Sequence, residues 1–362
     1  MDRFTRRSDK CFYSRKIMGL ILLVILLIAC PVGGLTMRAK AEARSATIVI
    51  EAESGRVLAA QNAQVRLPLA STTKILTAIT VIEHTDVNRV VAIPKQAEGV
   101  EGSSIYLRAG QKWSVTDLLY GLMLRSGNDS AVALALITAG SVDDFATMMN
   151  STAVAAGAYN SNFTNPHGLD DNKHYTTAFD LAMISRYAMR SSLFREIVAS
   201  KKHDYTDDTG KKCAFINKNK MLTGFNGANG IKTGFTKTSG RCLVSSALRE
   251  DMQLICVVLN TSNMWQASAQ LMEKSYKNYD MVTLADKEKP LTYAKLKYDK
   301  GEVAVSVQRT LRYPLSEEEK SNIRYEYNTV SNRTNTDKNI YMGKVNIYHK
   351  NYLLFSEKLY TI

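Results

Sequence analysis

LPLASTTKILTA, residues 67–78, places a serine and a lysine three positions apart at the expected start of a helix. Residues i and i+3 lie on one helical face, so Ser71 and Lys74 are expected to point the same way. A serine hydroxyl becomes a strong nucleophile only when a neighbouring group accepts its proton. A lysine does this only when burial or nearby positive charge lowers its pKa. The apolar flanks favour such burial, yet the pair alone also fits an ordinary surface helix.

Two further short motifs bear on that choice. RSGNDS puts Ser126 and Asn128 in a tight turn between two expected helices, and GIKTGFT puts Lys232, Thr233 and Gly234 on an expected strand. Glycine in a strand permits the close approach of a substrate backbone. Each motif alone is weak. Ser-x-x-Lys, Ser-x-Asn and Lys-Thr-Gly in this order in one chain favour a serine nucleophile with its base.

The composition describes a globular protein of one large domain with an appendage, or of two domains. The chain has 362 residues, of which 45% are hydrophobic and 22% are charged, and its net charge is +13. Residues 1–41 hold eight basic and two acidic residues, so the remaining excess is diffuse. Aromatic residues do not interleave with it in a nucleic-acid-binding pattern, which argues against that partner. An anionic cell-wall or membrane surface fits better.

The first 41 residues have the pattern of an export signal. A basic segment ends at Lys16, and the apolar run IMGLILLVILLIAC follows at residues 17–30. AKA at 39–41 predicts cleavage near Ala41 by a signal peptidase. Two alternatives stay open: LIAC could direct acylation of Cys30, or the segment could remain as a membrane anchor. All three place the rest of the chain outside the cytoplasm.

Strand patterns at both ends of a central block flank a series of helical patterns. Strands are expected on both sides of a Glu-Ser-Gly turn within 46–62 and again within 229–260. Helices are expected at 71–84, from Ser114, at about 128–139, 143–157 and 177–190, and at about 263–282. Ser114 with Asp117, and Thr177 with Asp180, are expected at helix starts. The pattern predicts an α/β (α+β) fold in which one sheet is assembled from distant segments and covered by helices.

The composition changes near Asp286, after which apolar and polar residues alternate without a helical stretch. We therefore predict three parts: a signal peptide or anchor at 1–41, a catalytic domain at 44–283, and a small all-β domain at 288–362. Outside the first part the chain has three cysteines, Cys213, Cys242 and Cys256, without metal-binding spacing. They are expected to be small buried residues of strands.

The three motifs in this order resemble the penicillin-recognising serine enzymes. LASTTKILTA, LRSGNDSAVALA, NPHGLD and GIKTGFT are similar to segments of the D-alanyl-D-alanine carboxypeptidases, the low-molecular-weight penicillin-binding proteins. The resemblance covers about residues 44–283, and the β-rich end fits that family's C-terminal domain. It implies a β-lactamase/transpeptidase-like antiparallel sheet, covered by helices, with the nucleophile at a helix start. It also implies removal of the terminal D-alanine from peptidoglycan stem pentapeptides, covalent inhibition by β-lactams such as penicillin, and no cofactor or metal.

The resemblance and the chemistry together assign a role to each motif residue. Ser71 attacks the substrate, Lys74 accepts its proton, and Ser126 relays a proton to the leaving amine. Asn128 holds the substrate amide, and the backbone N–H groups of Ser71 and Phe235 form the oxyanion hole. The terminal carboxylate is assigned to the strand residues Lys232, Thr233 and Thr236, with Gly234 admitting the substrate. Relatives often carry an arginine after the last strand for this carboxylate, but here the segment reads TSNMWQAS (261–268), so Arg241 is a candidate substitute.

Other residues are given structural roles. His167 in NPHGLD and His174 invite a metal reading, but ordering of a loop near the site fits them better. Asp180 is interpreted as a helix-capping residue rather than a general acid. A β-lactamase of the same fold would need a glutamate for deacylation, and between Asp129 and Ile231 the chain has only Glu196. A D,D-endopeptidase or transpeptidase on the same scaffold remains an alternative, as does a non-catalytic wall-binding protein.

Overall fold

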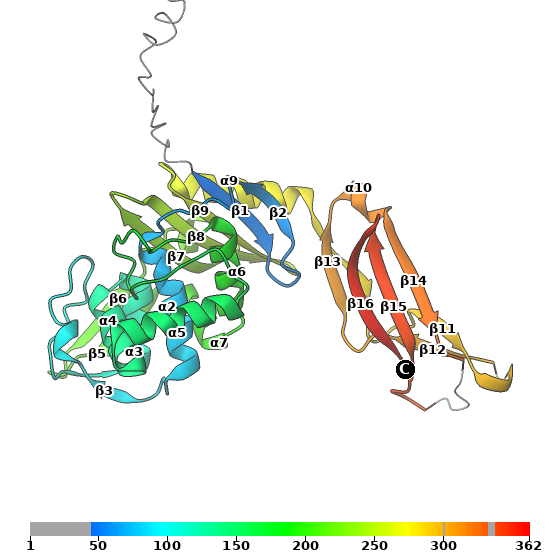
Figure 1. The fold of residues 1–362 in the computed structure, drawn as a ribbon, viewed down its shortest axis with the longest axis horizontal. Helices are drawn as coiled ribbons and strands as arrows, with labels where there is room; N and C mark the ends of the chain where they lie inside the picture. Colours follow the sequence, from blue (N-terminus) through cyan, green and yellow to red (C-terminus); the bar gives the residue numbers. More distant parts are fainter. Residues whose placement is uncertain (1–44, 300, 332–336) are drawn as a thin grey trace, which may run out of the picture. The chain divides into compact units, whose positions relative to one another are not determined.

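The computed structural model describes residues 45–299, 301–331 and 337–362 (Figure 1). Its main sheet is antiparallel and has the strand order β2-β1-β9-β8-β7. The strands are β1 (Ala46–Glu51), β2 (Val57–Gln61), β7 (Ala228–Thr236), β8 (Gly240–Arg249) and β9 (Met252–Leu259). This confirms one sheet built from distant segments. It also leaves β7, the strand of the Lys-Thr-Gly motif, at the edge of the sheet.

Both faces of this sheet are buried, because successive side chains of the central strands point alternately into two hydrophobic clusters. Ile48 and Ile50 of β1 join one hydrophobic cluster, while Val49 between them joins another on the opposite face. This is the two-residue period of a strand. The first cluster is packed against most of the helices, which are α2 (Lys74–His84), α3 (Val115–Tyr120), α4 (Asn128–Ala139), α5 (Val142–Ala155), α6 (Ala178–Ala188) and α7 (Ser192–Ala199). The second is covered by α9 (Met264–Asn278) (Figure 1).

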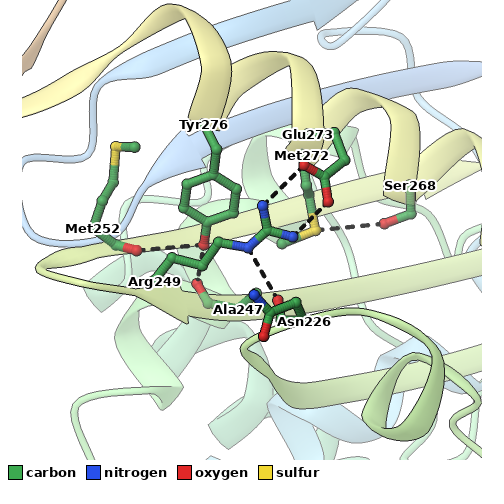
Figure 2. Close-up of polar contacts among 8 residues, drawn as sticks. All are labelled: Asn226, Ala247, Arg249, Met252, Ser268, Met272, Glu273 and Tyr276. Atoms are coloured by element: carbon green, nitrogen blue, oxygen red, sulfur yellow. Dashed lines mark hydrogen bonds and ion pairs between the residues drawn. The ribbon is translucent and has the colours of Figure 1, made fainter.

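A cluster around Arg249 ties the end of β8 to α9, as Figure 2 shows. The guanidinium makes two hydrogen bonds to the Glu273 carboxylate, at 2.9 and 2.5 Å, and a third to the Asn226 carbonyl at 3.2 Å. It also lies 4.6 Å from the ring centre of Phe225 and 4.5 Å from that of Tyr276. The planar, cationic side chain thus joins a sheet and a helix through charge and stacking at once.

The predicted helix starts are confirmed at two positions. Ser114 and Thr177 are N-caps whose side chains accept hydrogen bonds from the backbone N–H groups of Asp117 and Asp180. The Asp180 carboxylate itself accepts from the Asn160 backbone N–H at 2.6 Å and from a serine hydroxyl at 2.7 Å. Asp180 therefore anchors a loop to the start of α6, and the capping atom belongs to Thr177.

The structure adds short elements that the sequence patterns did not predict. They include α7 (Ser192–Ala199), η2 (Lys95–Ala97) and α8 (Met221–Gly224). They also include two two-stranded pairs, one formed by β3 (Val90–Ala92) with β4 (Lys112–Ser114) and one by β5 (Lys202–Thr206) with β6 (Lys212–Ile216). In the second pair, alternation around an Asp-Thr-Gly turn was a readable signal. Cys242 and Cys256 are buried in β8 and β9, as predicted, whereas Cys213 lies in β6 but is only partly buried. Burial raises the pKa values of Cys242 and Cys256 to about 11 and about 12. Among the described residues, no single helix is long and apolar enough to span a membrane, and only the bent pair α4–α5 is so when taken together.

The C-terminal part has a sheet and a hydrophobic core of its own. Its five-stranded sheet has the order β11-β12-β16-β15-β14 and consists of β11 (Thr292–Lys295), β12 (Glu302–Ser306), β14 (Ile323–Thr329), β15 (Tyr341–His349) and β16 (Tyr352–Thr361). A separate pair joins β10 (Asp280–Ala285) to β13 (Leu311–Leu315). The prediction of no helix here is wrong for two short turns, the 3₁₀ turn η4 (Lys297–Asp299) and α10 (Glu317–Lys320). The expected helix at 263–282 ends at Asn278. Ser316 and Glu319 form a capping box that starts α10, and the alternation DMVTLA pairs with β13 instead of extending α9.

Candidate active site

Ser71 and Lys74 lie on one face of the helix start, as their spacing predicts. Ser71 belongs to a 3₁₀ turn, η1 (Ala70–Thr73), and Lys74 is the first residue of α2. The hydroxyls of Thr72 and Thr73 donate to the carbonyls of Leu69 and Ala70, at 2.6 and 2.8 Å, and stabilise this turn. The Lys74 Nζ lies 3.0 Å from Ser71 Oγ. The two atoms are therefore within reach of direct proton transfer.

Lys74 is fully buried, and its Nζ has two further oxygen partners. The Asn128 Oδ1 lies at 2.7 Å and the His167 backbone carbonyl at 2.6 Å. Burial, followed by the charge of Lys232, lowers the Lys74 pKa well below its ordinary value. A neutral amine has two N–H donors and one lone pair. The two carbonyl oxygens use both donors, so the lone pair is left facing the Ser71 hydroxyl.

The Ser126–Asn128 turn connects a π-helical turn, η3 (Gly121–Arg125), to α4. Ser126 has φ of +65°, a left-handed conformation that is strained for a residue other than glycine. Its exposed fraction is 7%. Asn128 brings its side-chain carbonyl to Lys74, and its amide nitrogen donates to the Glu101 carbonyl at 2.6 Å. One amide N–H of Asn128 is not used by that contact. The turn thereby joins the second motif directly to the first.

The Lys-Thr-Gly strand runs close beside the start of the helix. A Cβ added to Gly234 would lie 3.0 Å from the backbone nitrogens of both Ser71 and Thr72, so only glycine fits there without displacement. Lys232 is 3% exposed, and its Nζ donates to the Thr233 carbonyl at 3.0 Å. Burial, with the nearby charge of Lys218, lowers the Lys232 pKa to about 7. All three motifs therefore meet in one site.

Two of the proposed carboxylate ligands are engaged with other groups. The Thr236 hydroxyl donates to the Asp170 carboxylate at 2.8 Å and lies 3.0 Å from the Ser239 hydroxyl. The Arg241 guanidinium lies 5.6 Å from the centre of the Phe235 ring, which is 62% exposed. Recognition of a carboxylate by Thr236 therefore requires that its bond to Asp170 be exchanged.

Sequence reasoning missed two residues that shape the site, Lys218 and Asp129, and one backbone contact, that of His167. The backbone carbonyl of His167, rather than its side chain, contacts Lys74. Lys218 lowers the pKa of both Lys74 and Lys232 through its charge. Asp129 is fully buried and acts in the opposite direction on Lys74. The basic run INKNK (216–220) was a signal for Lys218, whereas a backbone carbonyl has no signature in the sequence.

His174 orders the loop that follows the site. The Thr164 backbone N–H donates to its Nδ1 at 3.1 Å, so the ring proton is on Nε2 and donates to the Thr73 hydroxyl at 2.8 Å. Burial lowers the His174 pKa to about 4 and the His167 pKa to about 3, which keeps both rings neutral at pH 7. A cavity of about 370 Å³ lies beside this loop, with Gly168, Asp170 and Thr238 in its lining. Within the described ranges, no three His, Cys, Asp or Glu residues are grouped to hold a metal ion.

The chain matches known proteins over most of its described length. A sequence profile described as D-alanyl-D-alanine carboxypeptidase matches residues 35–263. The D-alanyl-D-alanine carboxypeptidase DacF of Bacillus subtilis is 31% identical over 283 residues, which are 76% of this chain and 72% of that protein. DacA of Escherichia coli K12 is 36% identical over 227 residues, 59% of this chain and 55% of that protein.

Solved structures show the same architecture. Penicillin binding protein 5 from Haemophilus influenzae has a TM-score of 0.72 and 27% identity, covering 88% of this chain and 96% of that one. A variant of the Streptomyces K15 DD-transpeptidase has a TM-score of 0.60 and 30% identity, covering 64% and 97%. The family match spans more than half of the chain and includes all three motifs. The chain therefore belongs to the D-alanyl-D-alanine carboxypeptidases, a family of serine-type peptidases.

Proposed function

We propose that this chain removes the terminal D-alanine from peptidoglycan stem pentapeptides through an acyl-enzyme on Ser71. The observation that carries the proposal is the environment of Lys74. Its two donors are used by the carbonyls of Asn128 and His167, and its lone pair faces Ser71 Oγ at 3.0 Å. A neutral buried lysine in that position is a general base for the serine.

Acylation begins with attack of Ser71 Oγ on the carbonyl carbon between the two D-alanines. The hydroxyl proton passes to Lys74 as the new C–O bond forms. The backbone N–H groups of Ser71 and Phe235 stabilise the oxyanion, and such donors contribute about 3 kcal/mol each. The close approach of Gly234 to the Ser71 and Thr72 nitrogens supports this assignment.

The C–N bond then breaks, and the leaving amine takes the proton that Lys74 accepted, relayed through the Ser126 hydroxyl. D-alanine departs, and a serine ester remains on Ser71. A water molecule adds to the ester carbonyl and restores the hydroxyl, which releases the shortened peptide. Asn128, which already contacts Lys74, holds the amide of the acyl part with its remaining N–H.

The substrate carboxylate binds where positive charge is concentrated. Lys232 supplies the charge and Thr233 a hydroxyl, and Lys218 adds a second positive charge whose effect reaches Lys232. A carboxylate brought to a lysine with a pKa of about 7 stabilises the protonated lysine. β-Lactams carry an amide carbonyl and a carboxylate in a related arrangement, so we propose that they acylate Ser71 and inhibit the enzyme.

The substrate implies a location outside the cytoplasm, at the cell wall or the outer face of the membrane. The export signal that supports this location falls within residues 1–41, which lie outside the described residues. Cleavage near Ala41, acylation of Cys30 and retention as an anchor remain alternatives. Contact with the membrane surface is a proposal that rests on the same segment.

The competing activities differ in what resolves the acyl-enzyme. The likeness to the K15 DD-transpeptidase favours transpeptidation as the second candidate, in which an amine replaces water. A β-lactamase is disfavoured because Glu196 lies on α7 and accepts a hydrogen bond from the Tyr120 hydroxyl at 2.9 Å. A non-catalytic wall-binding protein is disfavoured because all the motif residues are present.

The test is release of D-alanine by the purified protein from a peptide ending in D-Ala-D-Ala. We expect free D-alanine, and covalent labelling of the protein by a fluorescent penicillin. Ser71→Ala should abolish both, while Ser151→Ala, at an exposed serine of α5, should retain the label. Full labelling of the Ser71→Ala variant would contradict the assignment. An added amine acceptor that diverts the peptide into a coupled product would favour the transpeptidase.

A further inference from the structure

The loop between β3 and β4 is attached to the turn that carries Asn128. The Asn128 backbone N–H donates to the Ser103 carbonyl at 2.7 Å, and its side-chain amide donates to the Glu101 carbonyl at 2.6 Å. Gly102 between them has φ of +92°, and a Cβ there would lie 2.6 Å from Asn128 Nδ2. The loop is therefore part of the wall of the site on the side of Asn128.

A buried carboxylate holds the next residues of this loop. Asp129 is fully buried and accepts hydrogen bonds from the backbone N–H groups of Ile105 and Leu107, at 3.1 and 3.0 Å. It also accepts from the Ser104 hydroxyl at 2.6 Å. Leu107 is 2% exposed. Because both neighbours of Tyr106 are bonded to the same carboxylate, the backbone of Tyr106 is restrained from both sides.

Tyr106 itself has an unfavourable backbone conformation and an exposed ring. Its φ is +65°, and its exposed fraction is 85%. Glycine or asparagine adopts this left-handed conformation far more readily than an aromatic residue. Its backbone N–H donates to Ser104 Oγ at 2.8 Å, but no described residue hydrogen-bonds to its hydroxyl or stacks on its ring. The strained backbone of Tyr106 thus costs stability, and its ring is exposed to solvent beside the site without packing against the fold.

We propose that Tyr106 determines specificity by packing its ring on the peptide chain that precedes D-Ala-D-Ala in the substrate. The inference rests on the proposed function, in which Asn128 holds the amide of the acyl part and Lys232 the terminal carboxylate. The loop is bonded to Asn128, so Tyr106 belongs to the wall of the site on the side assigned to the acyl chain. A tyrosine ring has only two side-chain torsions, so it supplies contact area at a small cost in conformational entropy.

The test compares two substrates in the full-length protein. One is N-acetyl-D-Ala-D-Ala, and the other is a doubly acetylated L-Lys-D-Ala-D-Ala, which extends further on the acyl side. Tyr106→Gly should lower kcat/KM for the longer peptide by about tenfold, the loss of one aromatic contact. The same variant should change kcat/KM for the shorter peptide, and the acylation rate with benzylpenicillin, by less than about twofold. Tyr106→Phe should keep the parent preference for the longer peptide.

Tyr298→Gly is a matched control, because Tyr298 has φ of +62°, is 74% exposed and lies in the C-terminal part. It should leave both peptides unaffected. Three outcomes would overturn the inference. Tyr106→Gly could lower kcat/KM equally for both peptides, or it could keep the parent kcat/KM for the longer peptide. Tyr106→Phe could also lose the preference for the longer peptide. A parent protein that hydrolyses neither peptide would instead overturn the proposed function together with this inference. If the parent is active and Tyr106→Gly has the same activity, only the inference is overturned.

Discussion

At the level of single residues, two buried lysines reduce the stability of this protein while they suit its proposed chemistry. Lys74 and Lys232 are 0% and 3% exposed, and burial lowers the pKa of each. An unfolded chain holds both protons at neutral pH, whereas the folded chain binds the Lys74 proton only weakly. Stability then increases as the pH rises between the folded and the unfolded pKa values, because the unfolded state binds more protons in that window. The stability cost of burying these two lysines favours a functional role for them over a structural one.

Lys74→Arg should abolish acylation while the protein remains folded. A guanidinium does not deprotonate in a protein, so it cannot accept the Ser71 proton. We expect labelling by fluorescent penicillin to fall by at least about 10³-fold, consistent with loss of general-base catalysis. Circular dichroism should show the parent spectrum. Rapid labelling of the arginine variant would mean that another group is the base.

Lys232→Met should separate substrate recognition from stability. Loss of the charge should weaken acylation by about 2 kcal/mol or more and reduce the preference for a free-acid peptide over its amide. The same change removes a lysine whose pKa is lowered from an ordinary 10.5 to about 7 in the folded protein. At pH 7–8 the variant should therefore unfold at a higher urea concentration, with a gain on the order of 1 kcal/mol in the free energy of unfolding. Stability gained by the variant should diminish as pH rises toward 10.5.

Lys237→Met, at an exposed lysine just beyond β7, is the control and should alter neither property. If the Lys232→Met variant kept the parent preference for the free acid, carboxylate binding would belong to another group. Lys218 and Arg241 would then be changed next.

Among the elements of the fold, the loop carrying His167 is fitted against the start of the nucleophile helix. Gly168 has φ of +85°, and a Cβ there would lie 1.9 Å from the Ala70 carbonyl oxygen. The preceding carbonyl is the His167 oxygen that contacts Lys74. The Asn165 side chain accepts from the Gly168 N–H at 2.7 Å and holds the turn. The loop and the helix therefore together determine the position of Lys74, the proposed base.

Gly168→Ala should reduce both stability and acylation, because the new methyl group forces the loop away from Ala70 and moves the His167 carbonyl. We expect a loss of about 2–4 kcal/mol in the free energy of unfolding, from backbone strain and overpacking. Gly157→Ala is the matched control, with φ of +86° and nothing within 4 Å of the added Cβ. It should show only the cost of the backbone conformation, about 1 kcal/mol. Equal effects of the two changes would contradict a steric role for the contact with Ala70.

The Arg249 cluster of Figure 2 should contribute to stability without affecting catalysis. Arg249→Ala removes the paired hydrogen bonds to Glu273 and the stacking on two rings, and should cost about 1–2 kcal/mol in urea unfolding. Penicillin labelling should be unchanged. Arg309→Ala, which breaks an ion pair to Glu357 in which the arginine is 65% exposed, should cost less than about 0.5 kcal/mol. A cost as small at Arg249 would show that the cluster is not a structural anchor.

Across the whole chain, every proposed catalytic motif precedes the C-terminal β-rich part. The motifs lie between Ser71 and Thr236, while the C-terminal core gathers residues from Leu284 to Leu359. The proposed boundary between a catalytic domain at 44–283 and a β-rich domain at 288–362 remains a prediction. The β-rich part is proposed to position the enzyme near the wall or membrane, on the basis of fold analogy.

A protein ending at residue 286 should fold and still release D-alanine from a D-Ala-D-Ala peptide. Its main sheet and both clusters around it are complete without the C-terminal core. We expect kcat/KM within about threefold of the parent, since no proposed catalytic contact is lost. The measurement is D-alanine release after size-exclusion chromatography confirms a folded monomer. A folded but inactive protein would show that the proposed division is wrong.

Local features of this protein could be predicted from its amino-acid order alone. These features depend on near neighbours and on backbone geometry. They are the three-residue spacing of Ser71 and Lys74, the helix caps Ser114 and Thr177, and the glycine of the Lys-Thr-Gly strand. A single sheet built from distant segments also followed from the order of strand and helix patterns, whereas its antiparallel arrangement was implied by the family resemblance. The end of α9 and the turn α10 did not, since both depend on strand pairing and capping that compete with weak local propensity.

The surroundings of Lys74, in contrast, depend on contacts between distant segments. The His167 carbonyl reaches it from 93 residues away, and no side-chain type signals a backbone oxygen in advance. The charge of Lys218 and the burial of Asp129 likewise depend on which loops meet, as does the outward direction of Tyr106. The pKa of a lysine is set by desolvation and by charges close in space, and neither is a property of its sequence neighbours. The sequence therefore supplied the candidates for the reacting groups, and the fold determines the surroundings that set their protonation.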